Sequence, residues 1–236
     1  MYGKNPFDTL PAGLLSGSIV TCRQAGRPIM WVSDARGPAA QKIWERLYEE
    51  HPRTGLYPLL LDHSLDVDSM LDTPVSVEEI DETPGEQLIR EYFEYFGDEW
   101  PGFVPARRLG VPPGYAAGCL AAEGTSDYRL ALVPCERGAD APALIGWTGA
   151  VNYTYDVEKI AAVGRSWEDR FGVRVVKLGR STMEMSVAAP PRSITEARRI
   201  SLEHSGFCPS IWHDGITLDT YAARLVRQPA WRFWWD

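Results

Sequence analysis

Hydrophobic and polar stretches alternate along the chain in a way that predicts both strands and helices. In the first quarter, short runs of bulky apolar residues typical of strands occupy 18–24, 28–34 and 55–62. Between the last two, apolar side chains recur at helical spacing from Pro38. We expect that helix to stop at His51-Pro52, because the residue before a proline avoids helical geometry. Strand, helix and strand in this order predict a βαβ unit with a parallel pair of strands.

The next segment combines capping signals with an aromatic face. The sequences SVEE (76–79) and TPGE (83–86) both fit the capping box that opens a helix. The second is followed by apolar residues at helical spacing, and Gly97 suits the C-terminal cap. Residues 98–126 are rich in Pro and Gly, which favours an irregular linker.

The last half of the chain has the clearest pattern. Strands are predicted at 128–134 and 143–149, at 173–179 and 182–188 as a tight hairpin, and at 231–236. Helices are predicted from an N-cap at Asp156 to Gly172, from a capping box at Ser193, and over 218–227. From 143 onward the order is β-α-β-β-α-(α)-β, a ferredoxin-like order with one extra helix.

The last predicted strand, WRFWWD, concentrates three tryptophans in six residues. Strand alternation places Trp231, Phe233 and Trp235 on one face, which we expect to be buried. The other face carries Trp234, which we expect to pack against the N-terminal half of the chain; the alternative is that it lines a binding site.

Taken together, these elements predict an α+β (mixed α/β) fold. The N-terminal α/β region with its acidic helix covers 1–97, the linker 98–126 and a C-terminal domain 127–236. The chain has no basic stretch followed by an apolar run at its start, and no apolar run of membrane-spanning length, so we expect a cytoplasmic protein without membrane partners. Four scattered cysteines indicate free thiols.

Charge is distributed unevenly. The net charge is −8, yet residues 62–99 contain 13 Asp or Glu and one Arg. An acidic face repels phosphates, so nucleic acid is not expected as a partner. Arginine outnumbers lysine 20 to 4, which is typical of GC-rich coding DNA.

Several stretches of the C-terminal half together resemble a known family. ALIGWTGAVNY (143–153), RSWEDRFGVRVV (165–176), SLEHSGFCPS (201–210) and WRFWWD resemble the bacterial domain of unknown function 4253 (DUF4253) family. The segments WVSD (31–34) and EHPRTGLYPLLLD (50–62) are more loosely similar to the region that precedes this domain in high-GC bacteria. In that family an acidic residue commonly follows the Cys-Pro pair, where this chain has Ser210. The resemblance implies no activity, so no catalytic residue can be carried over from it.

The sharpest candidate for chemistry lies within EHSGFCPSIWHDG (203–215). A Cys with a His can act as nucleophile and base, and two His with a Cys and an Asp can bind zinc. The candidates are His204, Cys208, His213 and Asp214. Against this, His204 continues an apolar stripe and Cys208 follows Phe207, so both also fit a buried core. The sequence favours the core interpretation, and no metal or cofactor is predicted.

Two strand ends offer weaker candidates. Near 147–156 a predicted strand leads into a helix N-terminus, a common place for ligands; the candidates there are Trp147, Asn152, Tyr153 and Asp156. The strand predicted at 28–34 ends in Ser33 and Asp34, and Arg36 lies just beyond it; no nucleophile-elbow motif occurs around Ser33. Plain turn and capping chemistry is the favoured interpretation of both. The last strand adds Arg232, Trp234 and Asp236 as candidate contacts to a ligand or partner.

Because the chain is acidic, rich in aromatic residues and poor in catalytic motifs, the sequence favours a non-catalytic module that binds a protein partner. Two alternatives remain open. The first is a metal-binding protein or hydrolase-type enzyme centred on His204, Cys208, His213 and Asp214, and the second is a small-ligand sensor with a pocket near 147–156.

Overall fold

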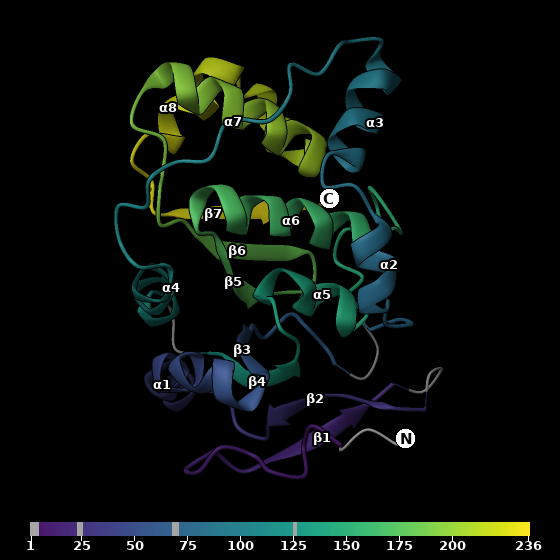
Figure 1. The fold of residues 1–236 in the computed structure, drawn as a ribbon, viewed down its shortest axis with the longest axis vertical. Coiled ribbons are helices and arrows are strands. Elements are labelled where there is room, and N and C mark those ends of the chain that lie inside the picture. The colour runs from purple at the N-terminus through teal and green to yellow at the C-terminus, as the bar shows by residue number, and fades with distance from the viewer. Residues whose placement is uncertain (1–4, 23–25, 68–70, 125–126) are drawn as a thin grey trace.

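The strands of both halves of the chain join in a single mixed sheet. The computed structural model describes residues 5–22, 26–67, 71–124 and 127–236. In this part of the chain the sheet has the strand order β1-β2-β4-β3-β5-β6-β7 (Figure 1). Its strands are β1 (Gly17–Thr21), β2 (Pro28–Ser33), β3 (Leu56–Leu61), β4 (Arg129–Pro134), β5 (Arg174–Leu178), β6 (Thr182–Ser186) and β7 (Ala230–Trp234).

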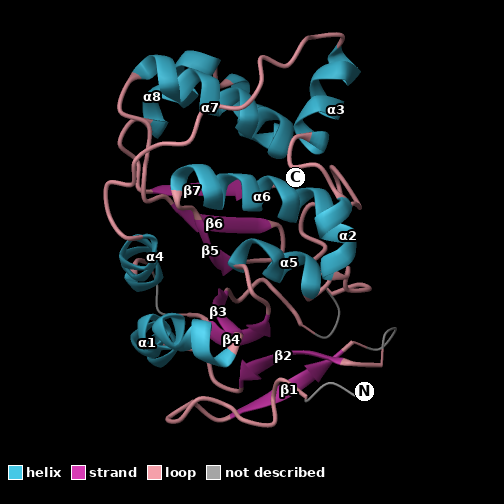
Figure 2. Cartoon of the chain, in the orientation of Figure 1, coloured by secondary structure: helices cyan, strands magenta, loops and turns pink. Residues whose placement is uncertain are grey.

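Helices cover both faces of this sheet (Figure 2). They are α1 (Pro38–Thr54), α2 (Val77–Glu82), α3 (Gln87–Phe96), α4 (Pro113–Ala122), α5 (Ala141–Leu144), α6 (Val157–Phe171), α7 (Ile194–Phe207) and α8 (Leu218–Leu225), with 3-10 turns η1 (Gly138–Asp140) and η2 (Pro209–Gly215). This mixture confirms the predicted α+β class. No helix among the residues described has both the length and the apolar character to cross a membrane.

Side chains along the central strands alternate between the two faces of the sheet, and helices cover each face. Leu56 and Leu60 of β3 pack with α1 and α4 on one face, around the buried side chain of Trp44. Tyr57 and Leu59 point to the opposite face, which α6 and α7 cover. A central strand must be apolar on both sides, and all six residues of β3 are buried.

The predicted helix stripes and caps account for the C-terminal layer. Ile160, Val163, Trp167 and Phe171 of α6 are all buried, and Gly172 closes the helix in left-handed geometry. Ser193 and Glu196 form the expected capping box of α7. The hairpin of β5 and β6 pairs antiparallel, and β7 adds to its far side with Trp231, Phe233 and Trp235 buried.

The predicted parallel pair of 28–34 with 55–62 is wrong. β2 and β3 run in the same direction with α1 between them, but β4 inserts between the two strands and pairs antiparallel with each. β3 finds its parallel neighbour in β5 instead. The strand that separates β2 from β3 comes from residues 129–134, so the sequence pattern of 28–62 alone could not reveal this arrangement.

The strand expected at 143–149 does not form. Residues 141–144 are the short helix α5, and Trp147 makes an isolated bridge with Leu71. The first strand of the C-terminal half is therefore β4, and the strand, helix, strand, strand, helix, strand order starts there. The spatial order is not ferredoxin-like, because β3 separates β4 from β5 and β7 lies at the sheet edge. Apolar runs this short do not distinguish a strand from a buried turn.

Three local predictions also need correction. Pro52 lies inside the last turn of α1, which ends at the left-handed Gly55; the ring of His51 is held by the carbonyl of Cys135 at 2.8 Å. Of the two capping boxes, the one at Ser76 forms, whereas α3 begins at Gln87 without a side-chain cap. Residues 98–126 are not irregular throughout, because α4 lies within them and packs on α1.

Candidate functional site around the 148–156 loop

His204, the first member of the candidate catalytic set, is a core residue. Its ring is buried among aromatic side chains, with its centroid 4.5 Å from that of Trp231, and its Nδ1 lies 3.0 Å from the Tyr221 hydroxyl. Burial, together with the nearby positive charge of Arg170, lowers the pKa of His204 to about 3. The imidazole is therefore neutral at ordinary pH.

The other three members lie apart from His204 and from a common centre. The Cys208 thiol is buried and donates to the Trp234 carbonyl at 3.1 Å, and burial raises its pKa to about 12. His213 and Asp214 pair with each other at 3.4 Å between Nδ1 and Oδ1, with Asp214 exposed to solvent. Within the described ranges no group of three or more His, Cys, Asp or Glu is arranged to hold a metal ion. The structure does not assemble this set into a site.

The segment from Trp147 to Asp156 links α5 to α6 as a series of tight turns. Trp147 is buried, and its indole Nε1 donates to the Gly179 carbonyl at 2.8 Å. The Tyr153 hydroxyl donates to the Gly206 carbonyl at 2.7 Å, and burial raises the pKa of this tyrosine. Asp156 precedes α6 but makes no side-chain cap; it pairs instead with Lys159 at 2.9 Å. These contacts hold the loop against α7 and the β5–β6 turn.

A groove runs between this loop and the aromatic face of α3, and we call it the aromatic groove. It has a volume of about 460 Å³, within the range of ligand-sized pockets. Tyr95 and Phe96 on its α3 side are 83% and 61% exposed. Its lining comprises Leu88, Glu91, Tyr92, Tyr95, Phe96, Tyr153, Thr154, Asp156, Lys159 and Pro209.

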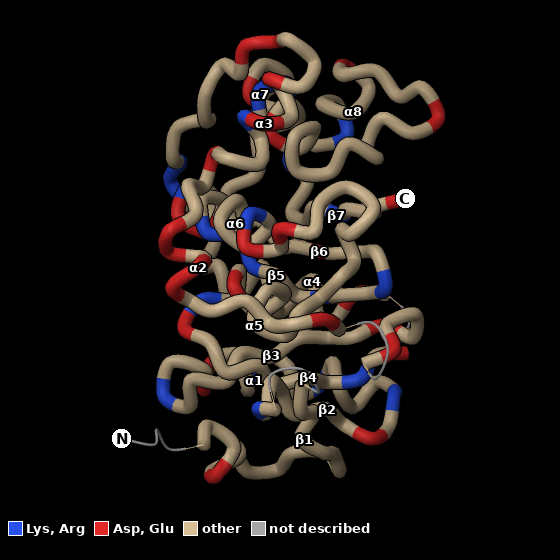
Figure 3. Tube along the Cα trace, turned by 90° about the vertical axis from the view of Figure 1, so that its right-hand side faces the viewer, with Lys and Arg blue, Asp and Glu red and all other residues tan. Residues whose placement is uncertain are grey.

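The rim of the aromatic groove is acidic. Lys159 bridges Glu91 at 2.7 Å and Asp156 at 2.9 Å, so its positive charge is already matched by two carboxylates. Residues 86–99 contain five carboxylates and one arginine. Figure 3 shows acidic positions along α2 and α3. A second hollow on the far side of α3, of about 470 Å³, is lined in part by Glu94, Asp98 and Glu99.

The candidates on the last strand divide between two environments. Arg232 pairs with Glu184 at 3.1 Å and with Glu123 at 2.8 Å on the solvent face of the sheet. Trp234 is 44% exposed and lies beside His213, with ring centroids 5.6 Å apart, rather than against the N-terminal half as the sequence favoured. Trp234, Asp236 and Asn152 line a separate hollow of about 330 Å³.

The candidates Ser33, Asp34 and Arg36 lie at the end of β2, of which Ser33 is the last residue. Ser33 is buried; its hydroxyl donates to the Ala35 carbonyl at 3.0 Å and accepts from the Leu130 amide at 2.9 Å. Asp34 accepts from the Ser16 hydroxyl at 2.6 Å. These contacts are turn and strand-end chemistry.

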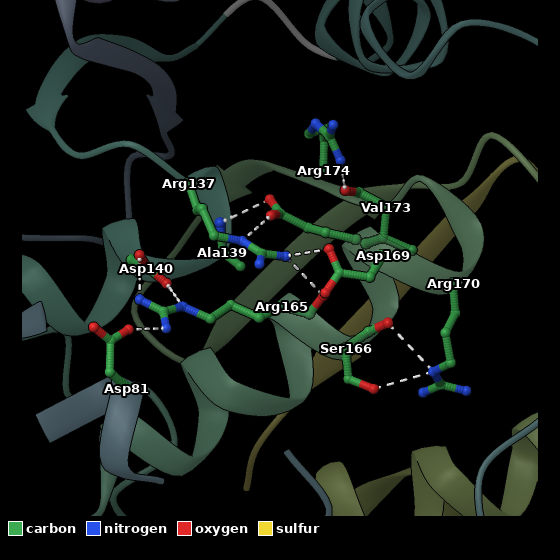
Figure 4. Close-up of polar contacts among 11 residues, drawn as sticks. Asp81, Arg137, Ala139, Asp140, Arg165, Ser166, Asp169, Arg170, Val173 and Arg174 are labelled. Carbon is green, nitrogen blue, oxygen red and sulfur yellow. Dashed lines mark hydrogen bonds and ion pairs between the residues drawn. The ribbon is translucent and has the colours of Figure 1, made fainter. Parts of the chain in front are cut away.

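A network of ion pairs, which no sequence pattern indicated, anchors α6 (Figure 4). Arg165 pairs with the buried Asp140 of η1 and with Asp81 of α2. Arg137 pairs with Glu168 at 3.0 Å and with Asp169 at 2.7 Å. These partners are far apart along the chain, and charged residues are too common for sequence to pair them. The network fixes the helix whose N-terminal turn forms part of the aromatic groove.

The structure defines an α+β protein with one mixed sheet and an exposed aromatic groove. Residues 129–236 match the family described as "Domain of unknown function (DUF4253)", which confirms the resemblance predicted for the C-terminal half. Comparison with curated proteins and with solved structures gave no match.

Proposed function

We propose that this protein is a non-catalytic binding module that captures a segment of a protein partner in the aromatic groove. The observation that carries the proposal is the exposure of Tyr95 and Phe96 beside a groove already lined by Tyr92 and Tyr153. Exposed aromatic clusters of this kind are typical of protein interaction sites, where aromatic side chains contribute most of the binding energy.

The polar groups of the groove support binding rather than catalysis. Lys159 is held by two carboxylates, and the Tyr153 hydroxyl donates to a backbone carbonyl. To act as a general base or a nucleophile, Lys159 or Tyr153 would have to break these contacts. The two side chains are therefore better suited to shaping the groove than to catalysis.

The charge of the groove supports one class of partner, a segment with basic residues. The carboxylates on and around α3 favour a segment that carries Lys or Arg next to large apolar side chains. The same charges disfavour a nucleic acid, because phosphates are repelled. We place the interaction in the cytoplasm of a bacterial cell, in keeping with the family resemblance.

A peptide-display selection on the folded protein tests the proposal. We expect the enriched peptides to combine aromatic or large aliphatic residues with Lys or Arg. Binding, measured by fluorescence polarisation, should weaken at least about tenfold in a Tyr95→Ser, Phe96→Ser double variant, because two anchors are lost. It should also weaken as salt is raised.

Tyr115 supplies a matched control, because it is 60% exposed on α4. Tyr115→Ser should bind the selected peptides like the wild type. Enrichment of acidic peptides, or equal binding by the double variant and the wild type, would reject the aromatic groove as the docking site.

A further inference from the structure

The hollow lined by Asn152, Trp234 and Asp236 differs in chemistry from the aromatic groove, and we call it the terminal pocket. Its volume is about 330 Å³, suited to a small molecule rather than to a protein segment. The turn between β5 and β6 contributes Arg180 and Ser181, and the 148–152 turn contributes Gly149 and Asn152. Three segments distant in sequence thus supply its walls.

Hydrogen bonds hold the β5–β6 wall in place. The Arg180 amide donates to the Ser64 hydroxyl at 2.8 Å, and the Trp235 amide donates to the Ser181 carbonyl at 2.9 Å. The carbonyl of Gly179 accepts a hydrogen bond from the indole of Trp147. A wall that is already ordered loses little entropy when a ligand binds.

The opposite wall is equally constrained. The Val151 amide donates to the Thr148 carbonyl at 3.0 Å, which closes the turn that carries Asn152. At Gly149 an added Cβ would lie 1.9 Å from a ring carbon of Trp147, so a side chain cannot fill the pocket from this position. The pocket therefore stays open beside an ordered turn.

Two residues of opposite charge line this pocket, and neither has an ionic partner in the described part of the chain. Arg180 and Asp236 both line the pocket, yet the side chain of neither takes part in an ion pair with a described residue. The nearby Arg232, by contrast, is paired twice. The guanidinium nitrogens of Arg180 and the carboxylate oxygens of Asp236 lie more than 4.0 Å from each other, so the two residues do not neutralise each other by direct contact. A ligand with both charges can bridge such a gap.

The remaining groups define the rest of the ligand. Trp234 presents a partly exposed ring as a flat apolar wall. Arginine recognises carboxylates through its planar pair of donors, and a carboxylate accepts from an ammonium group. We propose that the terminal pocket binds a free aromatic α-amino acid: Arg180 takes the carboxylate, Asp236 takes the ammonium group, and the side chain stacks on Trp234.

Calorimetry on the full chain, with three related probes, tests this assignment. L-Phenylalanine carries both charges, hydrocinnamate lacks the ammonium group, and phenethylamine lacks the carboxylate. We expect L-phenylalanine to bind and each of the other two to bind at least about tenfold more weakly, because one charge contact is lost. L-Tyrosine and L-tryptophan should bind as well.

Variants locate the site. Arg180→Gln and Asp236→Asn should each weaken L-phenylalanine binding at least about tenfold. The melting temperature should stay unchanged, since neither side chain forms an ion pair with a residue that the structure describes. Arg224→Gln, an exposed arginine on α8, is the matched control and should bind normally. The Tyr95→Ser, Phe96→Ser variant should also bind normally, which separates this site from the aromatic groove.

Three results would overturn the assignment. The first is no saturable heat with any of the three aromatic amino acids up to about 10 mM, an affinity too weak for a built site. The second is hydrocinnamate binding as tightly as L-phenylalanine, which would leave Asp236 without a role. The third is unchanged binding in both Arg180→Gln and Asp236→Asn.

Discussion

Trp147 and Trp235 pack edge to face, with ring centroids 5.4 Å apart and ring planes inclined by 74°. The first belongs to the turn after α5 and the second follows β7, so their contact ties the last residues of the chain to the 148–156 loop. Each indole also has a buried polar partner: Trp147 donates to Gly179 and Trp235 to the Phe207 carbonyl at 3.3 Å. The end of the chain is thus part of the core.

Neighbouring tryptophans allow a direct test of this contact. Trp235→Ala should lower the free energy of unfolding by about 3–5 kcal/mol, because a buried aromatic is replaced by a cavity. Trp234→Ala, one residue earlier and partly exposed, should cost less than about 1 kcal/mol. Urea denaturation measures both. Similar losses in the two variants would contradict the assignment of faces.

Removing residues 231–236 should abolish folding. The truncation deletes most of the edge strand β7 and three buried aromatic side chains, whose burial contributes on the order of 10 kcal/mol. That is comparable with the whole stability of a typical domain. A truncated protein that is soluble and melts cooperatively would refute this prediction.

His204 should make the protein sensitive to acid. Its pKa is about 3 in the fold and near 6.5 when unfolded, so between these values the unfolded chain binds the extra proton. The contribution of neutral His204 to the free energy of unfolding is therefore complete above pH 6.5. As the pH falls below 6.5, this contribution decreases by about 1.4 kcal/mol per pH unit. His204→Phe should remove this component, so denaturation between pH 4 and 6 should show a shallower pH dependence than in the wild type. Equal slopes would mean that His204 is already protonated in the fold.

The four thiols should differ sharply in reactivity. Cys119 on α4 is exposed, whereas Cys22, Cys135 and Cys208 are buried. Burial raises the pKa of Cys208 to about 12, so almost no thiolate is present at pH 8. We expect a disulfide reagent to modify one thiol rapidly in the native protein and all four after unfolding. Cys119→Ser should abolish the rapid phase; a fast reaction at Cys208 would contradict its burial.

The buried pair of Arg170 and Glu203 should be sensitive to loss of either partner. Glu203 is fully buried and accepts from Arg170 at 2.7 Å, from the Trp167 indole and from the Val104 amide. Glu203→Ala should therefore cost about 3–5 kcal/mol, because Arg170 is left without its carboxylate. Asp219→Ala breaks an exposed pair with Arg198 and should have no measurable effect on urea unfolding. An unchanged midpoint in Glu203→Ala would show that the pair adds nothing.

The location of the candidate sites was only partly predictable. Asn152, Trp234 and Asp236 were predicted as contact residues from two separate segments, and the structure brings them to one pocket. Arg180 was missed, because a lone arginine in a tight turn carries no distinguishing pattern. For the compact set of His204, Cys208, His213 and Asp214, closeness in sequence did not bring the four side chains together. His204 on α7 and Cys208 just after it are buried, as the favoured core interpretation expected, whereas His213 and Asp214 on η2 are exposed to solvent.

What the sequence determined by itself was local. Helix stripes, the capping boxes at Ser76 and Ser193, the β5–β6 hairpin and the buried face of Trp231, Phe233 and Trp235 depend on periodicity and on residues a few positions apart. Tertiary structure decided what depends on distant partners: β4 lies between β2 and β3, and Trp147 is anchored in a turn rather than in a strand. Strand neighbours and buried contacts are chosen by the free energy of the whole core, which no short window of sequence contains.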